Sequence, residues 1–380
     1  MASQLFFTTP QQRLQLARQR YFEEGLRPSG LVSEPVIQSW SRCLRARRDP
    51  AERIAFNPVT TSRVHSALAR AQLLLQAAST DLDRLEQTLA GTTCTALLTD
   101  AQGVVVHASR SSAHEPQRLL PLARRVGVSL DEHHVGTGAP GVALHTGQPC
   151  VVLGAEHFFS HLQVLQCAAA PIRDIHGRIA AVLDVTTESQ PFGFDAAALV
   201  GMHATAIENA LLRAQSGQHL VVQLQSTPAL LDTPMEGLAG VDSAGDLVWV
   251  NPVAARLLGV AHGPCRLPAA DVFGLQAHEI VRLSSPAAAT AHRLPNGLTV
   301  WLAVRLQARD GLSSLYALAA PAAAVPGPSC GPLPTTLRDG ERDLIERTVQ
   351  ACAGNVSKAA RTLGVSRGLV YRHLRRSRHP

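Results

Sequence analysis

The sequence predicts an α+β protein of several domains, with antiparallel sheets in the body and a small all-α unit at the C-terminus. Two observations lead to this fold class. A local pattern recurs three times in the body, in which an apolar segment, Asp-x-x-Gly and a second apolar segment follow one another. Asp at the first position and Gly at the fourth are typical of a tight turn between antiparallel strands. Stretches with helical periodicity separate these hairpins, and short amphipathic helices end the chain.

The repeated turn pattern gives the expected positions of the hairpins. Its three copies are Asp100–Gly103, Asp174–Gly177 and Asp242–Gly245, each with apolar residues on both sides. Asn296 and Gly297 mark a fourth hairpin, because Asn-Gly suits the type I′ turn that joins two strands. Two strands, residues 299–306 and 315–319, are expected to follow it.

A long helix is predicted before the first hairpin. Its apolar residues alternate three and four positions apart, which is the spacing of a coiled-coil stripe. Such a stripe packs on a neighbouring sheet or pairs with the same stripe of a second copy, and the sequence favours neither alternative. The stripe consists of Val64, Leu68, Ala71, Leu75, Ala78, Leu82, Leu85 and Leu89.

The C-terminal residues carry the net charge of the whole chain. Residues 337–380 contain ten Lys/Arg and four Asp/Glu (+6), and the full chain contains 35 and 29 (also +6). A small basic module on a neutral body is typical of a protein that binds nucleic acid. The one lysine, Lys358, lies in this module, so the residues before it have none for a phosphate-binding loop or a Schiff base.

Three short helices are predicted in this module. Asn355 or Ser357 caps the second helix, Gly364 makes the turn after it, and Ser366 caps the third. The N-terminal part of the third helix is expected to meet base edges in the major groove. The alternative is a basic amphipathic helix that binds RNA, a membrane or an acidic partner. The residues expected at DNA are Asn355, Ser357, Lys358, Ser366, Arg367, Leu369, Arg372, His373, Arg375 and Arg376.

Residues 354–376, GNVSKAARTLGVSRGLVYRHLRR, resemble the Fis-type helix-turn-helix that ends many bacterial enhancer-binding regulators. Leu369 stands where that family usually has a polar residue. The resemblance implies sequence-specific binding to double-stranded DNA, as a homodimer on an inverted repeat.

Residues 127–158 and 166–186 resemble the GAF-like sensor region of acetoin- and dihydroxyacetone-type enhancer-binding regulators. Residues 33–47 resemble the helix that opens this family, with Ile37, Trp40 and Leu44 on one face. The resemblance implies a small-molecule effector, such as an alcohol, ketone or aldehyde, or a metabolic enzyme as partner. The pocket residues it implies are Glu132, Gly136, Thr137, Glu156, His157, Phe158 and Cys167.

Residues 237–260 resemble the opening of a PAS domain, where two strands lead into a helix near Asn251. The ATPase module of the full-length relatives does not follow. Only an Ala/Pro/Gly-rich stretch, residues 319–336, lies between this region and the basic module. We therefore expect a regulator without ATPase activity.

Four other features of the sequence bear on possible chemistry. Gly136–Gly141 matches GxGxxG, but Pro140 and Gly147 interrupt the helix that a dinucleotide site requires. The GxSxG at 327–331 lies in the proline-rich stretch and not between a strand and a helix. A cluster of carboxylates and histidines, residues 131–134, 156, 157 and 161, suits a metal or an organic ligand, and we favour the latter. Cys94 and Cys167 are expected to be buried structural thiols, with redox sensing as the alternative. We expect no cofactor and no metal.

Composition restricts the class of protein. No uncharged apolar run approaches the length of a membrane span, and no signal peptide is recognisable at the N-terminus. The seven cysteines are scattered and contain no CxxC, which favours a reducing cytoplasm.

Together these observations predict a cytoplasmic DNA-binding transcriptional regulator that is not an enzyme. Its activity is expected to respond to a small molecule or partner protein at the GAF-like domain. A metal-dependent or small-molecule-binding enzyme with a basic localising tail is one alternative, and an architectural DNA-binding protein is another. The expected domains are a helical segment (1–58), a GAF-like domain (59–194), a connecting helix (195–227), a PAS-like domain (228–320), a linker (321–336) and the helix-turn-helix (337–380).

Overall fold

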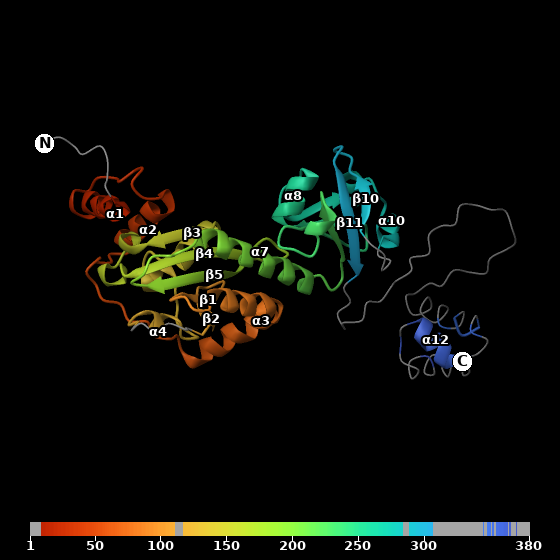
Figure 1. Ribbon diagram of the computed structural model, residues 1–380, viewed down its shortest axis with the longest axis horizontal. Helices are drawn as coiled ribbons and strands as arrows, with labels where there is room; N and C mark the ends of the chain where they lie inside the picture. Colours follow the sequence, from red (N-terminus) through yellow and green to blue (C-terminus); the bar gives the residue numbers. More distant parts are fainter. Residues whose placement is uncertain are drawn as a thin grey trace. The chain divides into compact units, whose positions relative to one another are not determined.

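The computed structural model describes residues 9–110, 117–283 and 289–306, and toward the C-terminus residues 345, 348–350, 352, 355–363, 365 and 370. The chain divides into two compact units, residues 1–318 and 319–380. The first unit contains two antiparallel sheets (Figure 1).

The first sheet has five strands in the order β2-β1-β5-β4-β3. Two long helices, α3 (Thr61–Leu89) and α7 (Ala196–Gln215), cover one of its faces (Figure 1). Small and branched residues of alternate strand positions meet these helices, among them Ala168, Leu183 and Val185. The strands are β1 (Thr95–Asp100), β2 (Val105–Ala108), β3 (Cys150–Leu153), β4 (Leu165–Arg173) and β5 (Ile179–Glu188).

The opposite face of this sheet packs on short helices and on the N-terminal segment. A second apolar core joins strand residues such as Leu97 and Val182 to Trp40, Phe158 and Phe159. Pro10–Arg18 (α1) runs into a π-helical turn, Gln19–Glu23, and α2 (Glu34–Arg45) follows. The other elements are α4 (Leu120–Ala123), α5 (Glu132–Val135), α6 (Ala139–Thr146) and two 3₁₀ turns, Gly154–Glu156 and Ser160–Leu162.

All four predicted hairpins are confirmed, but the fourth turn is not of type I′, because Gly297 has a positive φ and Asn296 does not. Asp100, Asp174 and Asp242 each accept two backbone N–H hydrogen bonds within the turn through Oδ1, at 2.9–3.0 Å. Asn296 accepts one from Leu298 in the same way, at 3.0 Å. The turns join β1 to β2, β4 to β5, β7 to β8 and β10 to β11.

The predicted helical stripe mostly packs on the first sheet. Ala71, Ala78 and the leucines at 82, 85 and 89 are buried there, together with Ala67 and Leu74, which lie outside the stripe. The three other members, Val64, Leu68 and Leu75, are only half-buried. An α-helix drifts about 20° per heptad against a strict 3.5-residue repeat. In the first half of α3 the stripe therefore lies at the edge of the contact with the sheet, where Leu68 and Leu75 still pack against the core but are only half-buried.

The second sheet has six strands in the order β10-β11-β6-β7-β8-β9. Residues 195–227, predicted as a connecting helix, are helical only to Gln215. Leu220–Gln225 forms β6, because its alternating apolar residues pair with β7 and β11. The helix expected near Asn251 is α8 (Pro252–Leu258), and Asn251 caps it by accepting from the N–H of Ala254 at 2.8 Å. The other elements are a 3₁₀ turn (Pro228–Leu230), β7 (Gly237–Val241), β8 (Asp246–Val250), β9 (Gly263–Pro268), α9 (Ala269–Phe273), α10 (Ala277–Arg282), β10 (Thr290–Arg293) and β11 (Thr299–Leu306).

In the C-terminal unit the described residues include one helix, α12 (Val356–Thr362). Asn355 caps it, since its side chain accepts from the N–H of Lys358 at 3.1 Å. Ile345, Ala360 and Val370 form a small buried core with half-buried residues around them. This core contains apolar residues from all three predicted helices. The strand predicted at 315–319 lies outside the described residues.

Candidate functional site

A small cavity lies on the face of the first sheet that is opposite α3 and α7. Its volume is about 40 Å³. Most of its wall is apolar, and strands β1, β4 and β5 form one side of it. The lining residues are Phe56, Leu97, Leu120, Ala123, Leu130, Val135, Gly138, Pro140, His157, Leu162, Leu165, Cys167, Asp184 and Thr186.

His157 and Cys167 form a neutral pair in the cavity wall. The Nδ1 of His157 lies 3.0 Å from the carbonyl oxygen of Gly154, so Nδ1 carries the proton and donates it there. Nε2 therefore accepts from the Cys167 thiol, 3.5 Å away. Burial lowers the pKa of His157 to about 4 and raises the pKa of Cys167 well above its usual value. A neutral imidazole beside a protonated thiol is not the ion pair of an activated cysteine nucleophile.

The N-terminal segment holds the loop that carries His157. The guanidinium of Arg18 is buried and donates to three carbonyl oxygens, those of Ala155, His157 and Phe158, at 2.6–3.1 Å. The indole Nε1 of Trp40 donates to the carbonyl oxygen of Glu156 at 2.7 Å. Four carbonyls of one short loop are thus bound to the same N-terminal segment, which fixes the cavity wall on that side.

Two further contacts join α2 to residues predicted for the pocket. Arg42 binds the carboxylate of Glu132 with both Nε and Nη2, at 2.6 Å each. The hydroxyls of Ser39 and Thr137 lie 2.7 Å apart in a buried hydrogen bond. Glu132 and Thr137 therefore attach α2 to the turn before α6 and do not line the cavity.

The remaining predicted pocket residues support the same loops. A Cβ at Gly136, whose φ is +63°, would lie 2.9 Å from the ring of Phe159. Phe158 is fully buried, edge-on to Phe159. The Glu156 carboxyl accepts from the N–H of Leu153 at 2.8 Å, and burial raises its pKa to about 7. Of the seven residues implied by the resemblance, the cavity is lined by His157 and Cys167.

Asp184 and Thr186 line the cavity and were not predicted. They lie in β5, on the face opposite Leu183 and Val185. A carboxylate within the apolar run of residues 179–185 was the signal in the sequence, because an acidic residue is rarely buried without a partner.

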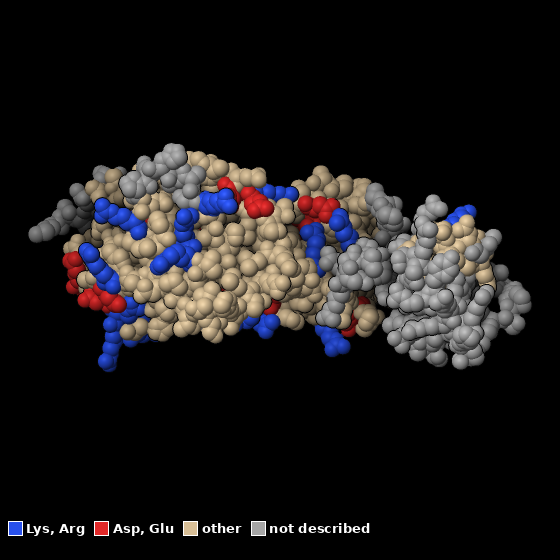
Figure 2. Space-filling view, turned by 90° about the horizontal axis from the view of Figure 1, so that it is seen from below, with Lys and Arg blue, Asp and Glu red and all other residues tan. Residues whose placement is uncertain are grey.

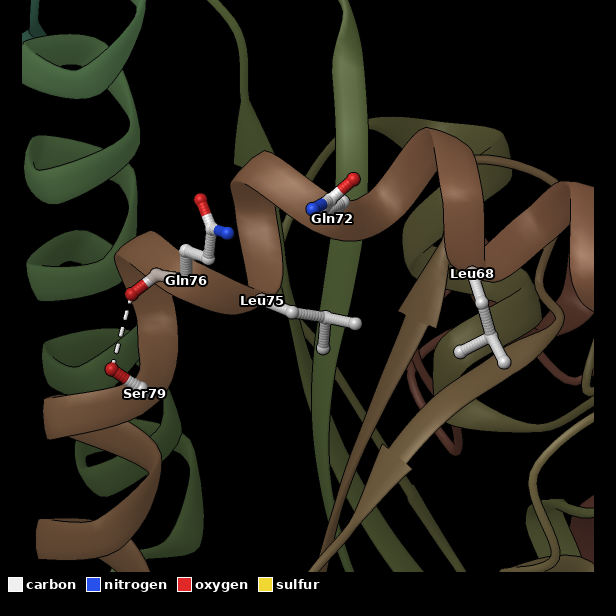
Figure 3. Close-up of a pocket in the computed structure, with 5 residues that line it drawn as sticks. All are labelled: Leu68, Gln72, Leu75, Gln76 and Ser79. Carbon is white, nitrogen blue, oxygen red and sulfur yellow. Dashed lines mark hydrogen bonds between the residues drawn. The ribbon is translucent and has the colours of Figure 1, made fainter. Parts of the chain in front are cut away.

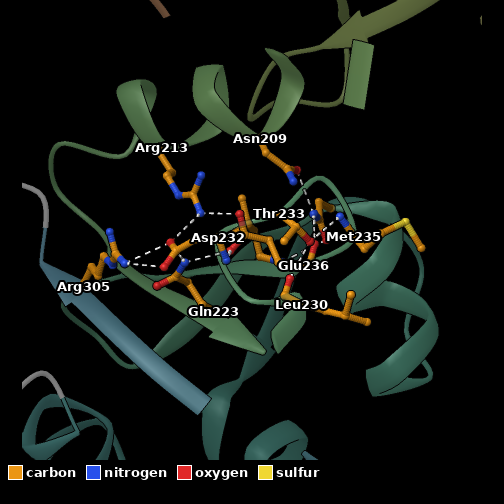
Figure 4. Close-up of polar contacts among 11 residues, drawn as sticks. Asn209, Arg213, Gln223, Leu230, Asp232, Thr233, Met235, Glu236 and Arg305 are labelled. Carbon is orange, nitrogen blue, oxygen red and sulfur yellow. Dashed lines mark hydrogen bonds and ion pairs between the residues drawn. The ribbon is translucent and has the colours of Figure 1, made fainter. Parts of the chain in front are cut away.

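A polar cluster joins the end of α7 to the second sheet (Figure 4). Arg213 of α7 forms an ion pair with the buried Glu236. Glu236 also accepts from Gln223 Nε2 at 2.7 Å and from the N–H of Asp232 at 3.0 Å. The side chain of Asp232 in turn binds Arg305 at 2.9 Å. These five residues, called the Arg213 cluster, fix the C-terminal turn of α7 against the second sheet.

A surface groove of about 520 Å³ lies along the first half of α3 (Figure 3). Its lining includes Leu68 and Leu75, the half-buried stripe residues at the edge of the contact with the sheet, with Gln72, Gln76 and Ser79. Seen from below, the face shows basic and acidic side chains separated by stretches of uncharged surface (Figure 2).

The residues predicted to contact DNA are described only in part. Asn355 caps α12, while Ser357 and Lys358 lie in its first turn. Ser366, Arg367, Leu369, Arg372, His373, Arg375 and Arg376 lie outside the described residues. Over the described ranges, no three His, Cys, Asp or Glu side chains come together as a metal site would require, including those of the cluster at 131–161. None of the helices in those ranges is long and apolar enough to cross a bilayer.

The fold and the basic module together define a class of protein, a sensor domain joined to a DNA-binding module. Residues 9–204 match the family described as MimR, N-terminal domain, and residues 336–376 match the bacterial regulatory proteins of the Fis family. The chain belongs to the MimR N-terminal domain family and carries a Fis-type helix-turn-helix at its C-terminal end.

The relatives confirm the resemblance to acetoin-type regulators. The chain is 31% identical over 250 residues to the acetoin catabolism regulatory protein of Cupriavidus necator, covering 64% of this chain and 37% of that protein. It is 29% identical over 300 residues to the propane 2-monooxygenase operon transcriptional activator MimR of Mycolicibacterium smegmatis, covering 75% and 46%. The chain thus spans less than half the length of either relative.

Among solved structures, the chain is similar to the Escherichia coli DhaR(N)–DhaL complex. The identity is 16%, with 72% of this chain and 99% of that chain covered and a TM-score of 0.45.

Proposed function

We propose that this protein is a sequence-specific DNA-binding transcriptional regulator that works without ATPase activity. The observation that carries the proposal is the pairing of a MimR-type N-terminal domain with a Fis-type helix-turn-helix in one chain. A small molecule or partner protein at the GAF-like domain changes its affinity for DNA or its activity. The regulators named among its relatives act on acetoin and propane genes, which supports a small organic effector.

The proposed domains follow the sequence boundaries, with one change. The helical segment (1–58), the GAF-like domain (59–194), the linker (321–336) and the helix-turn-helix (337–380) are kept. The PAS-like domain is extended to include β6, which pairs with β7 and β11 of its sheet.

The protein acts in the cytoplasm and is not an enzyme. No specific contact of the described residues favours the alternative of a metal-dependent enzyme with a localising tail.

The DNA-binding proposal is tested by replacing Arg367 and Arg372 with alanine. Loss of a base contact costs about 1–3 kcal/mol and loss of a phosphate contact weakens binding to all sequences. We expect at least a roughly 100-fold loss of affinity for genomic fragments selected by the wild-type chain, measured by fluorescence anisotropy. Arg63→Ala, on the exposed start of α3, is the control for loss of a positive charge outside the helix-turn-helix. Unchanged site-selective binding by the double variant would exclude this helix-turn-helix as the DNA-binding element.

We also propose that the chain is a homodimer, which an inverted repeat requires, and that the α3 groove contributes to its interface. Leu68 and Leu75 are half-buried and continue the apolar stripe that α3 presents to the sheet. A glutamate at position 75 places a charge in this apolar contact. Leu75→Glu is expected to shift the protein toward monomer in sedimentation velocity, whereas Leu73→Glu, at a leucine that is 42% exposed, leaves it dimeric. Equal sedimentation of both variants would place the interface elsewhere.

A further inference from the structure

Asp184 has one carboxylate oxygen without a partner among the described residues. It lies in β5, the central strand of the five-stranded sheet, and is fully buried. Its Oδ2 accepts from the hydroxyl of Thr186 at 2.5 Å, and its Oδ1 contacts no donor or acceptor within the described ranges. Because buried polar atoms in folded proteins are nearly always hydrogen-bonded, this oxygen marks a place where a partner is missing.

The surroundings of Asp184 favour its neutral form. The titratable groups that face it from neighbouring elements are His157, Cys167 and Cys150, and none of them supplies a positive charge. Burial raises the pKa of Asp184 to about 7. In mildly acidic solution the group is therefore a carboxylic acid. Since Thr186 already donates to Oδ2, the proton belongs on Oδ1.

The other polar atoms of the cavity wall already have partners. The two ring nitrogens of His157 are occupied by Gly154 and Cys167, and the Thr186 hydroxyl donates to Asp184. A ligand in the cavity thus meets apolar side chains and one O–H donor.

The size of the cavity limits the ligand. A volume of about 40 Å³ holds roughly three water-sized spheres, or an organic molecule of about four non-hydrogen atoms. An anion or a cation would lose its hydration in this apolar wall without gaining a charged partner.

We propose that Asp184 is the specificity-determining residue of this cavity and donates a hydrogen bond to the oxygen of a small uncharged alcohol, ketone or aldehyde. The inference rests on the proposed function, because it names the ligand class and the contact residue of the sensor domain. It adds a donor in β5 that the resemblance does not supply.

The test measures binding of four probes of matched size to the full chain at pH 6. The probes are 2-propanone, 2-propanol, acetate and 2-aminopropane. Their binding is detected by saturation-transfer difference NMR, which is sensitive to weak ligands. With so few atoms, dissociation constants are expected to be no tighter than roughly tens of micromolar. The two uncharged probes should bind and the two ions should not. The assignment would be overturned if acetate or 2-aminopropane bound with the same affinity as 2-propanone.

Three variants locate the contact. Asp184→Asn keeps an N–H donor at the same place and should bind 2-propanone within about threefold of wild type. Asp184→Leu keeps the volume but has no donor, and should bind at least about tenfold more weakly. Glu208→Gln is the control, because Glu208 is another buried carboxyl whose pKa burial raises, to about 6, and it is outside the cavity lining. Wild-type affinity in Asp184→Leu would refute the proposal. If circular dichroism shows that Asp184→Leu does not fold, the proposal is tested by Asp184→Asn and by the pH profile described next.

The pH profile gives a readout that a merely structural role would not change. The carbonyl of 2-propanone only accepts, so it binds the protonated form of Asp184. Wild-type affinity should fall about tenfold per pH unit above the pKa of Asp184, while Asp184→Asn stays constant from pH 6 to 9. A flat wild-type profile would overturn the proposal. Fluorescence anisotropy with DNA separates the ligand contact at Asp184 from the proposed regulation of DNA binding. If a probe binds through Asp184 without changing the affinity for DNA, the proposed regulation is contradicted and the contact at Asp184 is not.

Discussion

Replacing Trp40 with alanine is expected to destabilise the GAF-like domain by about 4 kcal/mol. The indole is fully buried, contacts the rings of Tyr21 and Phe22, and donates to the carbonyl of Glu156. The substitution leaves a large cavity and an unpaired buried carbonyl at the same time. Because α1 and α2 are attached to the sheet largely through this core, we expect both helices to open before the rest of the domain.

The measurement is the urea transition of the GAF-like domain, with amide hydrogen exchange to locate the loss of protection. Trp40→Phe retains most of the aromatic surface and loses the indole hydrogen bond. It should lower the free energy of unfolding by about 1–2 kcal/mol, in addition to any cost of repacking around the smaller ring. Trp301→Ala, at a half-buried tryptophan of β11, is the control for loss of an indole elsewhere. Unchanged exchange in residues 10–45 of Trp40→Ala would show that the N-terminal segment is held by other contacts.

Replacing Arg213 with methionine is expected to cost about 3 kcal/mol at the junction of α7 and the second sheet. The side chain of Glu236 is 1% exposed, so the substitution leaves a buried carboxylate with only Gln223 and the N–H of Asp232 as donors. Methionine keeps the apolar stem and removes the charge. The variant should also uncouple the two sheet domains, so that ligand binding no longer changes DNA affinity.

The same cluster contains a matched control. Arg305 and Asp232 form an ion pair whose side chains are 55% and 58% exposed, and such pairs contribute about 0–1 kcal/mol. Arg305→Met should therefore leave the thermal transition nearly unchanged. Adding Glu236→Gln to Arg213→Met should recover part of the loss, because it removes the unpaired charge. An equal loss in Arg213→Met and Arg305→Met would show that burial of Glu236 does not control this junction.

Local patterns were sufficient to predict the hairpins and the caps. An Asp at the start of a turn and a Gly at its end act within five residues, and Asn355 caps α12 through a neighbour three residues away. The helical stripe was harder to interpret, because two alternatives share one spacing. Most of the stripe packs on the sheet, and the drift of the helix leaves Leu68 and Leu75 at the edge of this contact, where they also line the groove.

The site could not be read in the same way, because its contacts are distant in sequence. Glu132 is matched by the family pattern, but its partner Arg42 lies ninety residues away, so sequence did not show that it holds α2. Leu44 was expected on one face of α2 with Ile37 and Trp40. It is 41% exposed, and Val36 and Cys43 are the residues that are buried together with Ile37 and Trp40. Asp184 carried a visible signal, a charge inside an apolar strand, and only the structure shows that the residue lines the cavity and that one of its oxygens has no hydrogen-bond partner within the described ranges.

Strand β5 separates two environments by the thickness of a single backbone. Asp184 and Thr186 line the cavity. Leu183 and Val185, which alternate with them along the strand, pack against α3 and α7 on the other face of the sheet. Under the proposed function, residues that contact the effector and residues that contact the two helices thus alternate along one stretch of chain. An engineer who wants a new effector would change the even-numbered residues of this stretch, and one who wants a stronger or weaker response would change the odd-numbered ones.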